Sequence, residues 1–449
     1  MTAKNGGTSE RTVMAPAPPV QLLLSDEALR GILLRICALV RDAGGRAWVV
    51  GGSVRDSAAE LGVRDLDIEV FGLKPAVLQA TLGAEFELDL VGQSFGILKL
   101  KGAPIDIGVP RRETKLGTGH RGFEVEADPD LPLRQAAARR DFTMNAVYLD
   151  PLTGELEDPF DGVGDLMRGV LRHTSPAFAE DPLRVLRGMQ LCARFDLVAA
   201  PETVDLCRTM GTEGLARERI FDEWRKLIVL GQRPSQGLDF LLRTGWLAHF
   251  PELDALRGVV QDPQYHPEGD VWIHTCHCLD AFADERIGDP WEDLVVGLAV
   301  LCHDLGKPAT TRTDEAGRIR SLGHEQKGLE LTTSLVERLT DQRRLLRDVL
   351  PLVAEHMRPQ QLWQQGAGDA AIRRLSARVG RIDRLERVAR ADNFGRPPLP
   401  REFPAGQWLL EKAAELGVTT HKPAPLVQGR HLQMLGIEPG PDYGRILER

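Results

Sequence analysis

The pattern of hydrophobic positions divides the chain into a first part that contains strands and a longer part that is almost entirely helical. Apolar residues recur at helical spacing over 28–43, which predicts an amphipathic helix, and the apolar run 48–50 predicts a strand. Strand-like segments continue to about residue 170. Beyond it, segments such as 182–195 and 218–230 alternate apolar and charged residues at helical spacing. The pattern therefore predicts an α+β protein, mostly helical, with a mixed sheet in its first part.

Carboxylates follow the first predicted strand at a spacing that suits metal binding. The strand runs into Gly51 and Gly52, where backbone amides can approach a phosphate, and Arg55 adds positive charge nearby. Asp65 and Asp67 stand at alternate positions of a strand, so their side chains point to the same side. Such a pair can hold a divalent metal for phosphoryl transfer onto a hydroxyl. An isolated Asp-x-Asp is usually a solvated turn, but the glycine turn and the arginine favour the metal site.

A third acid and a segment of mixed charge extend this candidate site. Asp106 lies between two apolar residues, and it is either a third catalytic carboxylate or an ordinary edge-strand residue. Residues 138–146 hold two guanidinium groups, a carboxylate and an amide. Guanidinium groups can bind a triphosphate, and Asp and Asn can bind ribose hydroxyls. The alternative for this segment is a charged helix start capped by Asp141.

Five motifs then occur in the order found in one enzyme family. They are GGSVRD, RDLDIEV, RRDFTMNA, DPFDGVGDL and EDPLRVLRGMQLCARF, within residues 45–265. With them the chain resembles the bacterial class II tRNA nucleotidyltransferases, a superfamily branch that includes bacterial poly(A) polymerases. The resemblance implies a polymerase β-like nucleotidyltransferase head in which Asp65 and Asp67 hold Mg²⁺. The residues that it implies at the nucleotide are Gly51, Gly52, Arg55, Arg139, Arg140, Asp141, Asn145, Asp181, Arg184 and Arg187.

The resemblance also implies that the motif at 180–184 selects the incoming base. In the family its Asp and Arg pair with the base as a complementary strand would, so Asp181 would accept from an exocyclic amine and Arg184 would donate to ring acceptors. Cytosine and adenine carry an amine donor there, whereas uracil and guanine present a carbonyl that a carboxylate would repel. The same residues also suit a helix N-terminus, with Pro182 near its first position. The two interpretations are compatible.

Two positions depart from the family's pattern, and one segment helps to predict which nucleotides the enzyme adds. Ala136 stands where the family often has an acid, and Gln190 stands where it often has a further arginine. The contacts that the family's residues at these two positions make with the triphosphate or the template base are therefore not expected in this chain. The segment 113–130 corresponds to a flexible loop that accompanies the switch from C to A addition in this family. Its presence argues against an enzyme that adds only CC.

A second candidate site lies in a stretch rich in histidine. Six of the eleven histidines fall between residues 266 and 356, and Asp304 follows His303 directly. The strings HPEGDVWIHTCHCLDAF, LAVLCHDLGKPATT, GHEQKG, AEHMRP and RADNF resemble the HD phosphohydrolase superfamily, whose helices present His and Asp to one or two divalent ions. The implied ligands are His274, His303, Asp304 and Asp392, with His324 and His356 as further ligands in two-metal members. Such ligands suit Mg, Mn, Ni or Co, although any one of these histidines is by default structural.

Composition indicates where the protein is located and whether it can bind RNA. The 449 residues contain no run of about eighteen apolar residues, which argues against a membrane span. Six scattered cysteines without a CxxC pair suit a reducing cytoplasm. The net charge of −9 argues mildly against RNA binding, although local charge has to decide. Seven arginines over 371–390, on one apparent helix, are either an RNA-backbone contact or a solvated surface.

The predicted domains follow from these features. They are a disordered tail (1–20), a nucleotidyltransferase head (21–170), a helical neck and body with the template and RNA binding (171–265), an all-α HD domain (266–395) and a helical tail (396–449). In the helical tail, a turn at 436–441 either packs the chain end or meets a phosphate.

The predicted function is template-independent addition of CMP, CMP and AMP to tRNA 3′ ends from CTP and ATP. The HD domain would add a phosphohydrolase activity or serve as a scaffold. One alternative is an enzyme that adds only A, or a poly(A) polymerase, because these share every head motif. Others are an HD phosphohydrolase with an RNA-binding head and a non-enzymatic RNA-binding protein. Neither a membrane nor an obligate protein partner is predicted.

Overall fold

The computed structural model describes residues 20–89, 97–115, 123–423, 429–438, 440 and 443. The chain divides into two compact units. The first comprises Met1–Val185 and Leu197–Gly214, and the second comprises Leu186–Asp196 and Leu215–Arg449. The predicted disordered tail lies outside the described residues except for its last position, and positions 439 and 441 of the predicted turn at 436–441 lie outside them as well.

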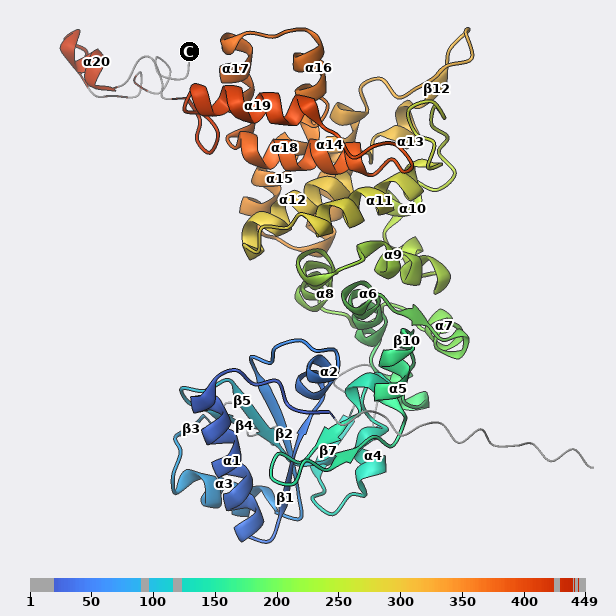
Figure 1. Ribbon diagram of the computed structural model, residues 1–449, viewed down its shortest axis with the longest axis vertical. Coiled ribbons are helices and arrows are strands. Elements are labelled where there is room, and N and C mark those ends of the chain that lie inside the picture. Colours follow the sequence, from blue (N-terminus) through green and yellow to red (C-terminus); the bar gives the residue numbers. More distant parts are fainter. Residues whose placement is uncertain are drawn as a thin grey trace, which may run out of the picture. The chain divides into compact units, whose positions relative to one another are not determined.

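A mixed sheet forms the centre of the first unit (Figure 1). Its strand order is β3 (Leu88–Asp89), β4 (Ile97–Leu100), β5 (Ile105–Gly108), β2 (Leu66–Phe71), β1 (Arg46–Val50), β8 (Tyr148–Leu149) and β9 (Leu156–Glu157). β2 and β5 run parallel, and the other neighbouring pairs of these described strands are antiparallel. The mixed sheet predicted for the first part of the chain is thereby confirmed.

Both faces of β1 are buried, which explains its uninterrupted apolar sequence. Val49 packs into the core that α1 (Glu27–Asp42) and α3 (Pro75–Gly83) share with the sheet, whereas Trp48 and Val50 pack with a separate group on the other face. Asp26 caps α1 by accepting from two backbone amides. The helix predicted over 28–43 is therefore confirmed with its start and end shifted by one residue.

The first unit contains further short elements. They are the helices α2 (Gly52–Ala58), α4 (Leu133–Ala137), α5 (Gly162–Met167) and α7 (Pro201–Arg208), the 3₁₀ turns Thr143–Asn145 and Pro176–Glu180, and the strand pairs β6 (Arg111–Lys115) with β7 (Phe123–Ala127) and β10 (Val170–Leu171) with β11 (Val198–Ala199). Within the segment 113–130, the described flanks form the antiparallel pair β6–β7, and the role of this segment in the switch from C to A addition stays a prediction. Residues 116–122 between them lie outside the described residues.

Helices form most of the second unit (Figure 1). They are α6 (Leu183–Phe195), whose first three residues belong to the first unit, α8 (Arg217–Leu230), α9 (Pro234–Arg243), α10 (Pro251–Asp254), α11 (Val271–Asp284), α12 (Pro290–Cys302), α13 (Lys307–Thr310), α14 (His324–Leu339), α15 (Arg343–Glu355), α16 (Arg358–Gln364), α17 (Asp369–Val379), α18 (Ile382–Phe394), α19 (Pro404–Glu415) and α20 (Gly429–Met434). The unit also holds a 3₁₀ turn (Trp246–His249) and the small hairpin of β12 (Arg312–Thr313) with β13 (Ile319–Arg320). Among the described residues, no helix is both long and apolar enough to cross a membrane.

The arginine-rich segment 371–390 is not one helix, which corrects the prediction. Gly380 adopts a φ of +74° after the end of α17, and α18 begins two residues later. Five of the seven arginines bind acids of the same unit: Arg378 binds Glu355, Arg381 and Arg384 bind Glu292, Arg387 binds Asp293, and Arg390 binds Glu285. These ion pairs favour the surface interpretation over an RNA contact.

Candidate functional sites

Three carboxylates of the first unit lie at neighbouring positions of the sheet. Asp67 of β2 is in register with Asp106 of β5, and Asp65 directly precedes β2. Partial burial raises the pKa of Asp67, the charge of Arg140 opposes this shift, and the charges of Asp65 and Asp106 add to it. Lys99 of β4 binds Asp106 at 2.5 Å. The three predicted acids therefore share one electrostatic environment, and their oxygen-only donor set suits Mg²⁺.

Gly51 lies where the acids meet Arg140. Its φ of +72° favours glycine, and a Cβ on this residue would lie 3.0 Å from Arg140 Nη1 and 3.7 Å from Asp67 Oδ2. Arg140 also lies 3.4 Å from a carboxylate oxygen of Glu69 and over the ring of Tyr148. The glycine thus leaves room between a guanidinium group and a carboxylate, at the start of the helix that Gly52 begins.

Arg55, Asn145 and Asp141 form a buried hydrogen-bonded chain. Arg55 Nη1 donates to Asn145 Oδ1 at 2.7 Å, and Asn145 Nδ2 donates to Asp141 Oδ1 at 2.9 Å. Arg55 also binds Asp56 at 2.6 Å. Asp141 accepts from the backbone amide of Phe142, and only a 3₁₀ turn follows, so it does not cap an α-helix as the alternative proposed. The structure therefore joins the motifs GGSVRD and RRDFTMNA through their polar side chains.

The motif at 180–184 lies at the start of α6. Asp181 Oδ1 accepts from the Leu183 amide at 3.0 Å, as a helix cap does. Arg184 donates to the carbonyl oxygens of Ala177 and Arg139 at 2.8 and 2.7 Å. The helix-start interpretation is therefore confirmed, while pairing of these side chains with a base stays a prediction.

The two positions that depart from the family's pattern are both buried. Ala136 is 6% exposed and Gln190 is 5% exposed. Arg139, which lies 3.6 Å from Glu180, and Arg187, which lies on α6, stay predicted contacts of the nucleotide.

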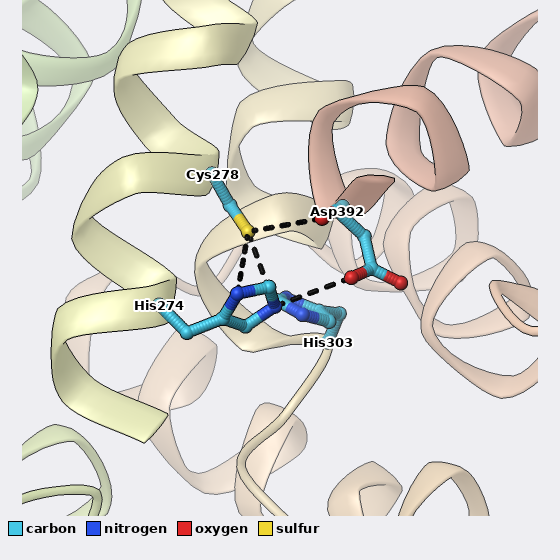
Figure 2. A group of neighbouring side chains, drawn as sticks. All are labelled: His274, Cys278, His303 and Asp392. Atoms are coloured by element: carbon cyan, nitrogen blue, oxygen red, sulfur yellow. Dashed lines mark hydrogen bonds and ion pairs between the residues drawn. The ribbon is translucent and has the colours of Figure 1, made fainter. Parts of the chain in front are cut away.

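The six predicted HD ligands come together within the second unit. His274 lies on α11, His303 and Asp304 follow α12, His324 begins α14, His356 follows α15, and Asp392 lies on α18. Figure 2 shows His274, His303 and Asp392 converging with Cys278, and His274 Nε2 lies 3.2 Å from Asp392 Oδ1. With the exception of Asp392, each of the six is less than 9% exposed.

Asp304 lies between two groups of these side chains. Its Oδ2 is 3.1 Å from His303 Nε2 and 3.7 Å from His274 Nε2, whereas its Oδ1 is 3.3 Å from His324 Nε2. His324 Nε2 is in turn 3.2 Å from His356 Nε2. Burial disfavours the ionised carboxyl, but the charges of the neighbouring cationic groups hold the pKa of Asp304 well below its usual range. A carboxylate that faces imidazole groups on both sides suits a site with two metal positions.

Backbone carbonyls orient three of the histidines. The ring atoms Nδ1 of His303, His324 and His356 lie 2.7 Å from the carbonyl oxygens of Val300, Ser321 and Val353. In a neutral imidazole that donates from Nδ1, the Nε2 atom carries a lone pair, and here this atom faces the site. His303 Nε2 and Asp304 Oδ1 are buried without a hydrogen-bond partner among the described residues. Buried lone pairs without donors are costly, so this donor set fits a divalent cation.

The sequence interpretation missed two residues of this site. Glu268 Oε1, in the loop before α11, accepts from His274 Nδ1 at 2.7 Å and from His266 Nδ1 at 2.9 Å. Burial opposes its ionisation, but these hydrogen bonds lower the pKa of Glu268 to about 2. Cys278 Sγ lies 3.3 Å from His274 Nε2 (Figure 2). The spacing of four residues between His274 and Cys278 on a predicted helix was the available signal for the cysteine.

A cavity of about 470 Å³ opens onto the Asp304 side of the site. Its lining includes Asp304 and three cationic residues, Lys307, Arg320 and Arg396. Lys307 Nζ lies 2.7 Å from both Asp304 Oδ2 and Gln261 Oε1. Cations around a metal-binding group suit an anionic substrate such as a phosphoester.

Three family models match the chain. The Poly A polymerase head domain matches residues 47–172, the probable RNA and SrmB-binding site of polymerase A matches 200–257, and the HD domain matches 277–391. His274 and Asp392 lie just outside the last range.

Relatives match over nearly the whole chain. A multifunctional CCA protein of Stenotrophomonas maltophilia (strain R551-3) is 36% identical over 426 residues, which cover 90% of this chain and 97% of the relative. A multifunctional CCA protein of Xylella fastidiosa (strain M23) is 38% identical over 389 residues, covering 83% and 90%.

Solved structures share the fold at lower identity. The Bacillus stearothermophilus CCA-adding enzyme in complex with CTP has a TM-score of 0.61 at 20% identity, covering 94% of this chain and 91% of that one. The Thermotoga maritima CCA-adding enzyme complexed with tRNA has a TM-score of 0.57 at 18% identity, covering 94% and 90%.

Proposed function

The chain belongs to the family of multifunctional CCA proteins, and we propose on this basis that its head builds the CCA end of tRNA with the residues described above. The reaction is template-independent transfer of CMP, CMP and AMP from CTP and ATP to the tRNA 3′ end, with pyrophosphate as the leaving group. The observation that carries the proposal is the meeting of Asp65, Asp67 and Asp106 beside Gly51 and Arg140.

Each group of the head has a distinct role in this proposal. Asp65 and Asp67 hold Mg²⁺, with Asp106 as the third acid, and the metal supplies Lewis acidity to the attacking 3′ hydroxyl and the triphosphate. Gly51 and Gly52 leave the backbone open to the phosphates, and Arg139 and Arg140 bind them. Arg55, Asp141 and Asn145 are held by one another, which suits the presentation of a fixed edge to the ribose. This network keeps the nucleotide in one orientation relative to the acids.

Base selection is assigned to Asp181 and Arg184, with Arg187 one helical turn further on. Asp181 accepts from the exocyclic amine that cytosine and adenine share, so both CTP and ATP are accepted and UTP and GTP are repelled. The backbone contacts of Asp181 and Arg184 support this role, because they hold both side chains at a fixed place at the start of α6.

The cluster at Asp304 supports a second activity, metal-dependent hydrolysis of phosphoesters. His274, His303, Asp304 and Asp392, with His324 and His356, would hold one or two divalent ions, and such ions would supply Lewis acidity for the hydrolysis. Lys307, Arg320 and Arg396 bind the substrate anion in the cavity. A divalent metal of the series Mg, Mn, Ni and Co fits these ligands, and six free cysteines suit a cytoplasmic location.

The test of the transfer activity is extension of three tRNA transcripts at single-nucleotide resolution. The transcripts end before CCA, after C and after CC, and each receives CTP, ATP or both with Mg²⁺. Extension of all three to a common CCA end is expected. Growth of the CC-ending transcript alone would make the protein an A-adding enzyme, and an unlimited ladder of A would make it a poly(A) polymerase.

A further inference from the structure

We propose that Cys278 is a thiolate ligand of the metal held by His274, His303 and Asp392, and that it makes this position selective for a thiophilic transition ion. The inference rests on the proposed metal site of the HD domain and adds a ligand to it. The thiol proton leaves to solvent when the sulfur binds the ion. Zn²⁺, Fe²⁺, Co²⁺ and Ni²⁺ then bind in preference to Mg²⁺ and Mn²⁺, because a thiolate is a soft ligand.

The distances between the donor atoms fit a metal polyhedron. In a tetrahedral site with bonds of about 2.0–2.3 Å, neighbouring ligand atoms lie roughly 3.3–3.6 Å apart. His274 Nε2 is 3.3 Å from Cys278 Sγ and 3.2 Å from Asp392 Oδ1. The ligand atoms of His274, Cys278, His303 and Asp392 all lie within 4.8 Å of one another (Figure 2). The set of two imidazoles, a carboxylate and a sulfur therefore has the size that one ion requires.

The nitrogen atoms that share the site with the sulfur are oriented as metal ligands. Glu268 accepts from His274 Nδ1, and the Val300 carbonyl accepts from His303 Nδ1, so both Nε2 atoms face the site, where a metal ion can replace a proton. His303 is 1% exposed, and its Nε2 has no hydrogen-bond partner among the described residues. An unpartnered buried imidazole nitrogen beside a thiol indicates a cation that both can bind.

The backbone holds the sulfur in this place. His274 and Cys278 are four residues apart on α11, so they lie on one face of the helix. A Cβ on Gly395, the residue after α18, would lie 2.3 Å from Cys278 Sγ and 2.8 Å from the Cys278 backbone nitrogen. Only a glycine permits this approach of the two chain segments. The same approach brings Asp392 of α18 beside Cys278, whose Sγ is 3.8 Å from the Asp392 carbonyl oxygen.

The alternative is a buried thiol that donates to this carbonyl and binds no metal. Absorption spectra of the full chain loaded with Co²⁺ after chelator treatment distinguish the two. A thiolate bound to Co²⁺ gives a near-ultraviolet charge-transfer band, which oxygen ligands such as Asp65 and Asp67 cannot produce. Cys276→Ser is the matched control, because Cys276 lies on the same helix and outside the metal-binding groups found among the described residues.

The wild type and Cys276→Ser are expected to show the band, and Cys278→Ser and Cys278→Ala are expected to lose it. Zn²⁺ affinity in competition with a chelator should fall at least about tenfold in both Cys278 variants, the lower end of what losing even an outer partner costs. Unchanged CCA addition and circular dichroism would show that the variants are folded.

Two other outcomes distinguish failure of the Cys278 ligation from failure of the HD metal site itself. If Co²⁺ binds to the wild type in a His303-dependent manner but without the band, Cys278 is not a ligand and the proposed HD metal site stands. If His303→Ala changes neither the amount nor the spectrum of bound Co²⁺, the HD metal site fails and the ligation fails with it.

Discussion

The head site and the HD site are built on opposite electrostatic principles. In the head, acids adjoin acids, and with partial burial this raises the pKa of Asp67. In the HD site, cationic groups surround buried carboxyls and hold the pKa of Asp304 and of Asp392 well below the usual range, although burial alone would raise them. A cation bound beside these acids would therefore favour the ionised form of Asp67. The HD site pairs its carboxylates with imidazole groups, and a metal ion that binds there would replace the imidazole protons at Nε2.

If both proposed metal sites are correct, this difference predicts metals of different chemistry at the two sites. The head offers the carboxylate oxygens of Asp65 and Asp67, which are exposed residues, and this oxygen-only donor set would suit Mg²⁺. The HD site offers buried nitrogen, oxygen and sulfur, which suits a resident transition ion. The two sites belong to separate units of the chain, so each should respond to its own substitutions.

The largest expected effect comes from Asp67→Asn. The near-isosteric amide removes a charge from the three acids, and nucleotide addition to tRNA should fall on the order of 10³-fold, as when a group that stabilises developing charge is lost. Hydrolysis of a phosphoester at the HD site should not change. Initial rates of CTP incorporation measure the first effect, and Asp42→Asn, an exposed acid at the end of α1, is the control. Equal losses in both variants would remove the catalytic assignment.

The converse change, Asp304→Asn, should lower the rate of metal-dependent phosphoester hydrolysis on the order of 10²-fold and leave the rate of CCA addition unchanged. The amide cannot face His303 and His324 with two negative oxygens. Release of phosphate from a generic aryl phosphate in the presence of Co²⁺ or Ni²⁺ measures it. Asp341→Asn, in the exposed turn between α14 and α15, is the control. A parallel loss of CCA addition would break the independence of the two sites.

The sequence predicted best what depends on spacing along one segment. Alternation along an extended segment predicted that Asp65 and Asp67 lie close together; Asp67 lies on β2, Asp65 directly precedes it, and the register places Asp106 beside Asp67. The six HD ligands were assigned by motif order, and the structure brings them together.

Some contacts between distant segments that no motif marks were not predicted. Glu268 follows a proline in a loop, and only the fold shows that it orients His274. The arginines of 371–390 were expected on one helix, but Gly380 follows the end of α17, and their acidic partners include residues of α12 and α15 and Glu285, which follows α11. Cys278 had helical spacing from His274, but a cysteine on an apolar helix is usually part of the core.

A substitution at Gly395 should disturb the HD site and leave the head site unchanged. The Ala side chain would overlap Cys278, so Gly395→Ala should lower the free energy of unfolding by about 1–3 kcal/mol, the usual cost of overpacking, and should weaken Co²⁺ binding. Urea unfolding and Co²⁺ titration measure these effects. In Gly368→Ala the added Cβ has no atom within 4 Å, and this control should be close to wild type. Wild-type metal affinity in Gly395→Ala would mean that the contact with Cys278 does not position the site.

The smallest expected effect tests whether the arginines beside the HD site serve the fold. Glu292 of α12 binds Arg384 of α18 at 2.7 Å, and mainly this hydrogen bond lowers the pKa of Glu292 below 4.5. A carboxyl with a lowered pKa stabilises the folded state above its unfolded pKa, and the contribution is lost as the pH falls through the folded value. At pH 7, Glu292→Gln should therefore be less stable than wild type by about 1 kcal/mol, since solvent screens part of the interaction. The difference should shrink as the pH falls below 4.5.

Urea unfolding of both proteins at pH 7 and pH 3 measures this difference in stability, with Glu330→Gln on the exposed face of α14 as control. A difference that stays constant between the two pH values would show that the ion pair does not supply the stability, and would return these arginines to consideration as RNA contacts.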